Sequence, residues 1–163
     1  MKQSARTPIV IVLDRLRSAH NTGNIFRLAD AVNAAEIITC GYTPSPPHPK
    51  LEKTAMGADK LVPCRSFPSS YDAVTALRSE GWVKQIVAVE TGRPSSCAWE
   101  FGYEYPVALI FGNEALGIED RTISVCNGIV SLPMLGGKES VNVGNCAAVV
   151  LYAALAAFRS GRK

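Results

Sequence analysis

Short runs of apolar, mostly β-branched residues recur along this chain, and segments with helical spacing of apolar residues separate them. The clearest runs, 8–13 and 107–111, are apolar throughout, as expected for strands buried on both faces. The pattern predicts further strands at 36–40, 61–64, 85–89 and 128–132, and helices at 24–33, 51–55, 71–78, 120–125 and 142–159. Strands that alternate with helices predict an α/β protein whose mostly parallel sheet has about six strands and helices on both faces.

Composition narrows the class of protein further. With 163 residues the chain is most simply one domain, and its formal net charge of +3 is compatible with a polyanionic partner without requiring one. The five cysteines are odd in number and none has C-x-x-C spacing, which favours reduced, mostly buried thiols in a cytoplasmic protein. With only two histidines, no metal site is expected. The apolar stretch 146–158 is shorter than the roughly 20 residues of a membrane span, so no membrane is expected either.

Three polar segments, 18–27, 112–117 and 131–145, each follow a predicted strand. Because the carboxyl ends of parallel strands share one edge of a sheet, we expect the three segments to converge there. In the third segment, two glycines precede Ser140 and Asn142 where the last helix begins. Free backbone N–H groups would then lie next to the positive end of a helix dipole. The combination predicts a ligand site at this edge.

Each segment alone has a purely structural explanation. Asn21 is a natural helix cap, and Arg27 would be a surface residue of the same helix. Gly112 and Gly117 are typical turn residues, and Glu114 would be a solvated loop carboxylate. No local rule, however, requires Gly-Asn-Glu after a strand or Ser-Val-Asn before a helix. The three segments together therefore favour a binding site.

The segments carry recognisable motifs, which are Asn21-x-Gly-x-Ile-x-Arg27, Ile110-Phe-Gly-Asn-Glu-Ala-Leu-Gly117 and Leu132-Pro-Met-x-Gly-x-x-x-Ser140-Val-Asn142. In this order they resemble the signature motifs of the SpoU (TrmH) family, the S-adenosylmethionine-dependent RNA ribose 2′-O-methyltransferases of the SPOUT class. The resemblance covers essentially the whole chain. It implies methyl transfer to a ribose 2′-hydroxyl of tRNA or rRNA, with S-adenosylmethionine as cofactor. It also implies a C-terminal deep trefoil knot and a homodimer.

The resemblance implies a domain organisation as well. Residues 1–163 would form a single SPOUT methyltransferase domain, without the extra N-terminal RNA-binding domain that many members carry. Recognition by a catalytic dimer alone favours tRNA over a large rRNA site. The apolar helix 142–159 is expected either at the dimer interface or buried inside the monomer. Two departures from the family pattern are Gly144, where members often have serine, and Val141, where leucine is usual; neither puts cofactor binding in serious doubt.

Individual residues acquire roles from the same resemblance. It places the cofactor against Val89, Glu90, Thr91, Gly112, Gly117, Leu132, Met134, Ser140, Val141 and Asn142. It gives catalytic roles to Arg27, Asn21, Glu114, Ser140 and Asn142, and RNA contacts to Arg27, Lys50, Lys53 and Arg65. The family is proposed to use its arginine as a general base, but arginine is effectively always protonated. A bidentate grip on an RNA phosphate that orients the hydroxyl is the physically better role for Arg27.

Two other classes of function stay open at the level of sequence. One is a catalytically silent RNA-binding protein on the same scaffold, against which the intact set of Arg27, Glu114, Ser140 and Asn142 argues. The other is a flavodoxin-like mononucleotide binder, which the coarse pattern of strands and helices alone permits.

Overall fold

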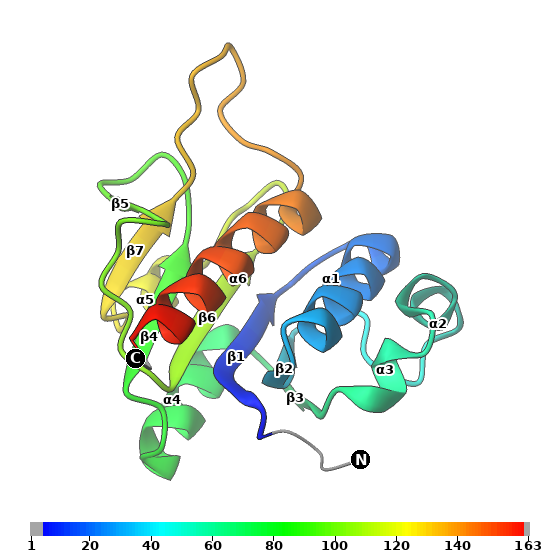
Figure 1. Ribbon diagram of the computed structural model, residues 1–163. Coiled ribbons are helices and arrows are strands. Elements are labelled where there is room, and N and C mark those ends of the chain that lie inside the picture. The colour runs from blue at the N-terminus through cyan, green and yellow to red at the C-terminus, as the bar shows by residue number, and fades with distance from the viewer. Residues whose placement is uncertain (1–4, 162–163) are drawn as a thin grey trace.

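A single parallel sheet sets the architecture. In the computed structural model, which describes residues 5–161, seven strands lie in the order β3-β2-β1-β6-β4-β7-β5, and all their pairings are parallel (Figure 1). The strands are β1 (Thr7–Asp14), β2 (Ala34–Cys40), β3 (Cys64–Phe67), β4 (Gln85–Val89), β5 (Ser96–Cys97), β6 (Val107–Gly112) and β7 (Gly128–Ser131). The expected α/β sheet is confirmed, but six strands was one too few. The missed strand, β5, has only two residues, too few for an apolar pattern.

Helices cover both faces of the sheet, as predicted. They are α1 (Ala19–Ala31), α2 (Pro49–Ala55), α3 (Ala58–Leu61), α4 (Ser70–Glu80), α5 (Asp120–Ile123) and α6 (Val143–Ser160). Figure 1 shows α1, α2, α3 and α6 together on one side of the sheet, with α4 and α5 behind the strands. Helix α1 packs against both α2 and α6, so the first and last helices of the chain are neighbours.

Strand β1 shows why the central strands are apolar at consecutive positions. Ile9, Ile11 and Leu13 belong to the core under α1, α2 and α6, whereas Val10 and Val12 belong to the core under α4. All five side chains are fully buried, because successive side chains of a strand point to opposite faces and helices cover both. Burial of each such side chain stabilises the fold by about 1.5–3 kcal/mol. The strand is therefore a firm platform for the loop at its carboxyl end.

The edge strand β3 begins later than the strand predicted at 61–64. Leu61 ends α3, and the ring nitrogen of Pro63 has no hydrogen to donate to a strand ladder. The Pro63 carbonyl still accepts a hydrogen bond from the backbone N–H of Ile37 at 2.9 Å, so pairing with β2 starts directly after it. β3 lies at the edge of the sheet, where a proline next to a strand is tolerated.

Helix α1 begins five residues earlier than the pattern predicted. Its cap is Ser18, whose Oγ accepts a hydrogen bond from the backbone N–H of Asn21 at 3.1 Å. The structural explanation of Asn21 as the cap is therefore wrong. Asn21 lies inside the first turn instead, and its side chain is free to make the contacts described below.

The cysteines are less buried than expected. All five are free thiols, but only Cys40 is buried, and Cys64, Cys97, Cys126 and Cys146 are half-buried. Burial of the sulfur still raises the pKa of Cys126 to about 11. This thiol therefore stays protonated near neutral pH, as expected for an inert structural cysteine.

The last helix, α6, is apolar on most of its surface. By length and composition alone it could cross a membrane, with a mean hydropathy of 1.4 over 18 residues, a test that core helices of soluble proteins also pass. One side is buried in the core under α1, through Ala147, Val150, Leu151 and Ala154. On the outer side, Val149 and Tyr152 are 44% and 50% exposed. Burial inside the monomer therefore does not account for the outer apolar face.

Candidate functional site

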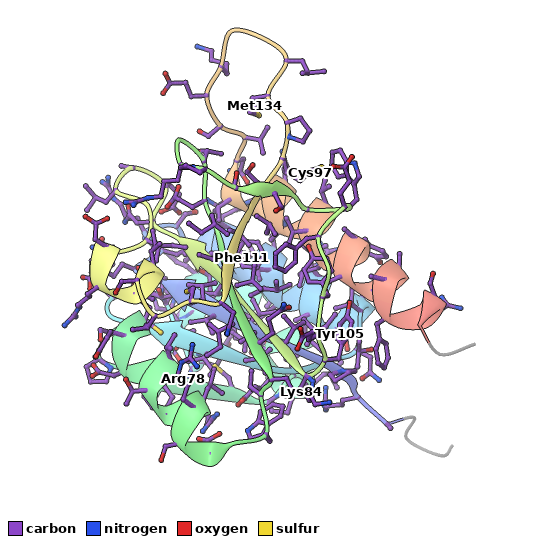
Figure 2. All side chains as sticks on the ribbon, turned by 90° about the vertical axis from the view of Figure 1, so that its left-hand side faces the viewer. Arg78, Lys84, Cys97, Tyr105, Phe111 and Met134 are labelled. Carbon is purple, nitrogen blue, oxygen red and sulfur yellow. The ribbon has the colours of Figure 1, made fainter. Side chains whose placement is uncertain are left out.

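The carboxyl ends of β4, β6 and β7 and the start of α6 enclose a cleft of about 410 Å³. All ten residues expected to hold a cofactor line it: Val89, Glu90, Thr91, Gly112, Gly117, Leu132, Met134, Ser140, Val141 and Asn142. Figure 2 shows Met134 in the long loop that projects from the molecule, with Phe111, which also lines the cleft, in the sheet below. The cleft falls within the size range of small-molecule sites.

The loop after β6 owes its shape to Asn113, which sequence reasoning did not single out. Its side chain is 4% exposed, and its Oδ1 accepts hydrogen bonds from the backbone N–H groups of Ala115 and Leu116, both at 2.8 Å. Its Nδ2 donates to the backbone carbonyl of Arg15 at 2.7 Å, which ties this loop to the loop after β1. The available signal was an asparagine directly after Gly112 in a glycine-flanked loop.

Two glycines allow the same loop to fold close to its neighbours. A Cβ added to Gly112 would lie 2.7 Å from the backbone nitrogen of Ile118, too close for any side chain. Gly117 has a φ of +67°, in the left-handed region that favours glycine, and its own Cβ would lie 2.4 Å from a carboxylate oxygen of Glu90. The motif glycines are therefore required by the backbone of the cleft wall.

A chain of hydrogen bonds joins the three motif segments. Asn21 Nδ2 donates to Glu114 Oε1 at 3.2 Å, and Asn142 Nδ2 donates to Asn21 Oδ1, also at 3.2 Å. Glu114, to which the family resemblance gives a catalytic role, therefore contacts Asn21. Residues far apart in the sequence meet here, so the predicted convergence of the three segments is confirmed.

Glu114 is anchored on its other side by the loop before α1. Its Oε2 accepts a hydrogen bond from the backbone N–H of Arg17 at 3.1 Å, and its Oε1 accepts one from that of Ser18 at 3.4 Å. Partial burial opposes ionisation, but these hydrogen bonds and the one from Asn21 outweigh it and hold the pKa of Glu114 below its usual value. The carboxylate is therefore charged at neutral pH and acts as an acceptor only.

Asn142 also forms the start of α6. Its Oδ1 accepts hydrogen bonds from the backbone N–H groups of Gly144 at 2.8 Å and Asn145 at 3.4 Å, which makes it the helix cap. The departure at Gly144 has a structural counterpart, because a Cβ there would lie 2.9 Å from Nδ2 of Asn24. The side chain of Asn24 takes up the space that a serine would need.

The remaining predicted residues are more scattered. Ser140 lines the cleft, whereas Arg27 is exposed on α1 outside it and has no ion pair with any described residue. Lys50 and Lys53 are exposed on α2. The Arg65 guanidinium is already engaged, with both of its contacts to Glu36 at 2.8 Å and further hydrogen bonds to Glu80, so it is a poorer candidate for RNA contact than the two lysines.

All the charged side chains that line the cleft are carboxylates. Glu90, Glu114 and Glu139 line it, and no lysine, arginine or histidine of the described chain does. None of the three carboxylates forms an ion pair within residues 5–161. The cleft is thus acidic in a chain whose net charge is +3, and it favours a cationic ligand over a phosphate.

A parallel α/β sheet with a small-molecule cleft at the carboxyl ends of its strands defines a cofactor-binding α/β protein. The chain matches the SpoU rRNA Methylase family over residues 8–152, and it belongs to this family. The family resemblance that the three motifs indicated is therefore confirmed.

Individual relatives agree with this assignment. The chain is 33% identical over 156 residues to the 23S rRNA (uridine(2479)-2′-O)-methyltransferase of Streptomyces viridochromogenes, an alignment that covers 93% of this chain and 54% of that protein. It is 30% identical over 147 residues to the tRNA (guanosine(18)-2′-O)-methyltransferase of Thermus thermophilus, covering 90% of this chain and 73% of that one. The chain thus spans about half the length of the first relative.

A solved structure shows the same fold. The SpoU methyltransferase AviRb from Streptomyces viridochromogenes, crystallised in complex with the cofactor AdoMet, superposes with a TM-score of 0.84 at 29% identity. The match covers 98% of this chain and 64% of that one.

Proposed function

We propose that this protein transfers the methyl group of S-adenosylmethionine to a ribose 2′-hydroxyl of RNA. The observation that carries the proposal is the hydrogen-bonded chain Glu114–Asn21–Asn142, which joins the three motif segments beside a cleft lined by every residue expected to hold the cofactor. The names of the relatives, which are 2′-O-methyltransferases of 23S rRNA and of tRNA, support it.

The residues of the cleft fit S-adenosylmethionine. When bound there, it supplies a methyl group activated by a positively charged sulfonium. Leu132 and Met134 offer apolar surface for the adenine, and the closely packed backbone at Gly112 leaves no side chain in its way. The unpaired carboxylates fit a cation, and they would repel the phosphate of a mononucleotide. The flavodoxin-like alternative is disfavoured on this ground.

Arg27 is assigned to the RNA rather than to the cofactor. Its guanidinium is exposed on α1 and no described carboxylate pairs with it, so it is available to an anionic ligand. A bidentate contact with an RNA phosphate would fix the neighbouring 2′-hydroxyl and stabilise negative charge as it develops on the oxygen. The chain Glu114–Asn21–Asn142 would position α1, and with it Arg27, relative to the cleft.

The test is to replace Arg27 and to measure two quantities separately. We expect Arg27→Ala to abolish methyl transfer from labelled S-adenosylmethionine to RNA, and Arg27→Lys to be nearly as damaging because lysine lacks the bidentate fork. Calorimetric affinity for S-adenosylmethionine should stay unchanged in both. The matched control is Lys84→Ala, which removes a cation at the end of the molecule opposite the Met134 loop (Figure 2).

Retained transfer in Arg27→Ala would contradict the role of Arg27. Binding of RNA by the wild-type protein with no binding of S-adenosylmethionine would instead favour the catalytically silent RNA-binding protein. The substrate mixture should contain total tRNA and, in a second arm, rRNA, both from a strain that lacks this enzyme. We infer tRNA as the substrate, with Lys50 and Lys53 of α2 as phosphate contacts that give affinity without sequence specificity.

We further propose that the protein works in the cytoplasm as a homodimer, with the outer face of α6 in the interface. The exposed Val149 and Tyr152 support the interface, and the five free cysteines support a reducing compartment. The deep trefoil knot implied by the family belongs to the same proposal. Support comes from the segment after β4, which lies against β7 through the Ala98 N–Ser131 O hydrogen bond at 3.0 Å. An experimental backbone trace that straightens when both ends are pulled would contradict the knot.

A further inference from the structure

Glu90 stands out among the three carboxylates of the cleft because its charge is fixed in place. Its Oε1 accepts a hydrogen bond from the backbone N–H of Thr91 at 3.0 Å, and its Oε2 accepts one from that of Ile118 at 2.9 Å. Glu114 is held by the loop before α1, and Glu139 is exposed in the projecting loop without a hydrogen bond to a described residue. Glu90 alone joins two walls of the cleft.

The contact of Glu90 with the opposite wall is close. Its backbone N–H donates to the carbonyl of Val130 at 3.0 Å, which ties it to β7, and its carboxylate reaches the loop after β6 at Gly117 and Ile118. A residue of any other type at position 117 would collide with this carboxylate, since the added Cβ would lie 2.4 Å from Oε2. The side chain therefore fixes the spacing of the loops after β4 and β6.

No cation of the described chain compensates this charge. A second hollow of about 420 Å³ shares Glu90 and Gly117 with the cleft, and the cation nearest along its wall, Arg93, is already paired with Asp120. The charge of Glu90 also acts on Cys146, which lines the cleft. Burial is the larger cause and the negative charge of Glu90 the smaller one, and together they raise the pKa of the Cys146 thiol to about 11. Both hydrogen-bond donors of Glu90 are neutral backbone groups, so its full negative charge acts on whatever the cleft holds.

We propose that Glu90 makes the cleft charge-selective, so that it binds the sulfonium form of the cofactor more tightly than the neutral thioether that remains after methyl transfer. The proposal rests on the proposed function and adds a specificity-determining residue to it. In methyl transfer, a lone pair of the ribose 2′-oxygen forms the new O–CH₃ bond and the hydroxyl proton is released. The bonding electron pair of the S–CH₃ bond stays on sulfur, so the ligand loses one positive charge. The attraction between the ligand and the carboxylate fixed in the wall of the cleft is then lost, and we expect this attraction to be worth about tenfold in affinity at an intermediate dielectric.

Isothermal titration calorimetry with three ligands separates charge from shape. S-adenosylmethionine carries the sulfonium, S-adenosylhomocysteine is neutral at that position, and sinefungin carries an ammonium on carbon there. We expect the wild-type protein to bind the two cationic ligands about tenfold more tightly than S-adenosylhomocysteine. In Glu90→Gln, this ratio should fall towards one. If Glu90 only spaced the loops, all three affinities would weaken together and the ratio would persist.

Two further variants complete the test. Glu139→Gln changes an exposed cleft carboxylate without hydrogen bonds to described residues, and we expect a partial fall of the ratio with unchanged folding. Glu104→Gln makes the same charge change at an exposed site outside the cleft and should leave the ratio unchanged. Equal wild-type affinities for all three ligands, or an unchanged ratio in Glu90→Gln, would overturn the charge selectivity while the proposed function stands. Failure of the wild-type protein to bind any of the three would overturn the proposed function itself.

Discussion

Asn142 has two functions that depend on different atoms of one side chain. Its Oδ1 accepts the hydrogen bonds that cap α6, while its Nδ2 donates to Asn21 and so connects α6 to α1. An asparagine can do both because its amide carries an acceptor and a donor on opposite sides. The cap stabilises α6, whereas the hydrogen bond to Asn21 fixes the position of α1 relative to the cleft.

Two substitutions of Asn142 should separate these functions. Asn142→Ala removes the cap, and we expect the free energy of unfolding to fall by about 1 kcal/mol. Asn142→Asp keeps an acceptor and places a negative charge at the start of a helix, so stability should be retained. Neither alanine nor aspartate has a side-chain N–H to donate to Asn21, so methyl transfer should drop sharply in both variants. Urea denaturation and transfer of labelled methyl to tRNA check the two expectations; full activity of Asn142→Asp would rule out the connection as a requirement.

At this scale the sequence predicted which residues gather but not how they are held. Seven of the ten cofactor residues could be named because the motifs carry them, and the other three, residues 89–91, came from the family resemblance; all ten line the cleft. The contacts of Glu90 and Asn113 could not be named, because they depend on loop conformations in which one side chain reaches backbone N–H groups of another segment. The spacing of residues along the chain does not predict such a contact. For Arg65, the sequence suggested an RNA contact. It could not show that the guanidinium pairs with Glu36 and Glu80, because these two residues lie on other elements.

Among the elements, α1 and α2 approach each other where α1 has a glycine. A Cβ added to Gly23 would lie 1.9 Å from Oγ1 of Thr54 on α2, and 2.9 Å from the backbone nitrogen of Ala55. The glycine of the first motif is therefore a packing residue. Because α2 carries Lys50 and Lys53, this contact also fixes where the two lysines stand.

We expect Gly23→Ala to destabilise the protein by about 1–3 kcal/mol, since overpacking outweighs the better helix propensity of alanine. Adding Thr54→Ala should recover part of the loss by removing Oγ1, although the backbone nitrogen of Ala55 remains close. Gly102→Ala is the matched control, because nothing lies within 4 Å of a Cβ at that position. Thermal and urea unfolding of the four proteins measure the effect. A Gly23→Ala protein as stable as the Gly102→Ala protein would contradict the packing role.

Element type could be predicted better than element boundary. The runs at 86–89 and 107–111 are apolar at consecutive positions, and β4 and β6 lie there. The first turn of α1 was missed because its residues, from Ala19 to Gly23, contain no large apolar side chain to mark a helical stripe. Its burial comes from Gly23 packing on α2, which is a tertiary contact.

At the scale of the whole molecule, neither the order of the strands nor the surroundings of α6 could be predicted from periodicity. In the order β3-β2-β1-β6-β4-β7-β5, β4 lies between β6 and β7, so its neighbours in the sheet are not its neighbours in the sequence, and crossovers connect them. Such crossovers follow from how helices pack on the faces, which strand patterns do not encode. The apolar composition of α6 likewise predicted that the helix is buried, but not which part of the protein or which partner covers it. In the monomer only one side of α6 is covered (Figure 1).

The uncovered side of α6 leads to the last prediction. If the outer face is a dimer interface, a charge placed at its centre should separate the subunits, because an unpaired lysine would have to be buried against the partner. We expect the wild-type protein to sediment as a dimer and Val149→Lys to sediment as a monomer at the same concentration. The matched control is Ser79→Lys, an exposed position near the end of α4 on the opposite face of the sheet.

Folding and cofactor binding provide the check on that result. Circular dichroism and calorimetric affinity for S-adenosylmethionine should show that Val149→Lys remains folded, because Val149 lies outside the cleft. The melting temperature of the wild-type protein should rise with protein concentration, as mass action requires when a partner subunit stabilises the fold, whereas that of Val149→Lys should not. A wild-type protein that is monomeric at all concentrations would contradict the homodimer, and the outer face of α6 would then need a different partner to cover Val149 and Tyr152.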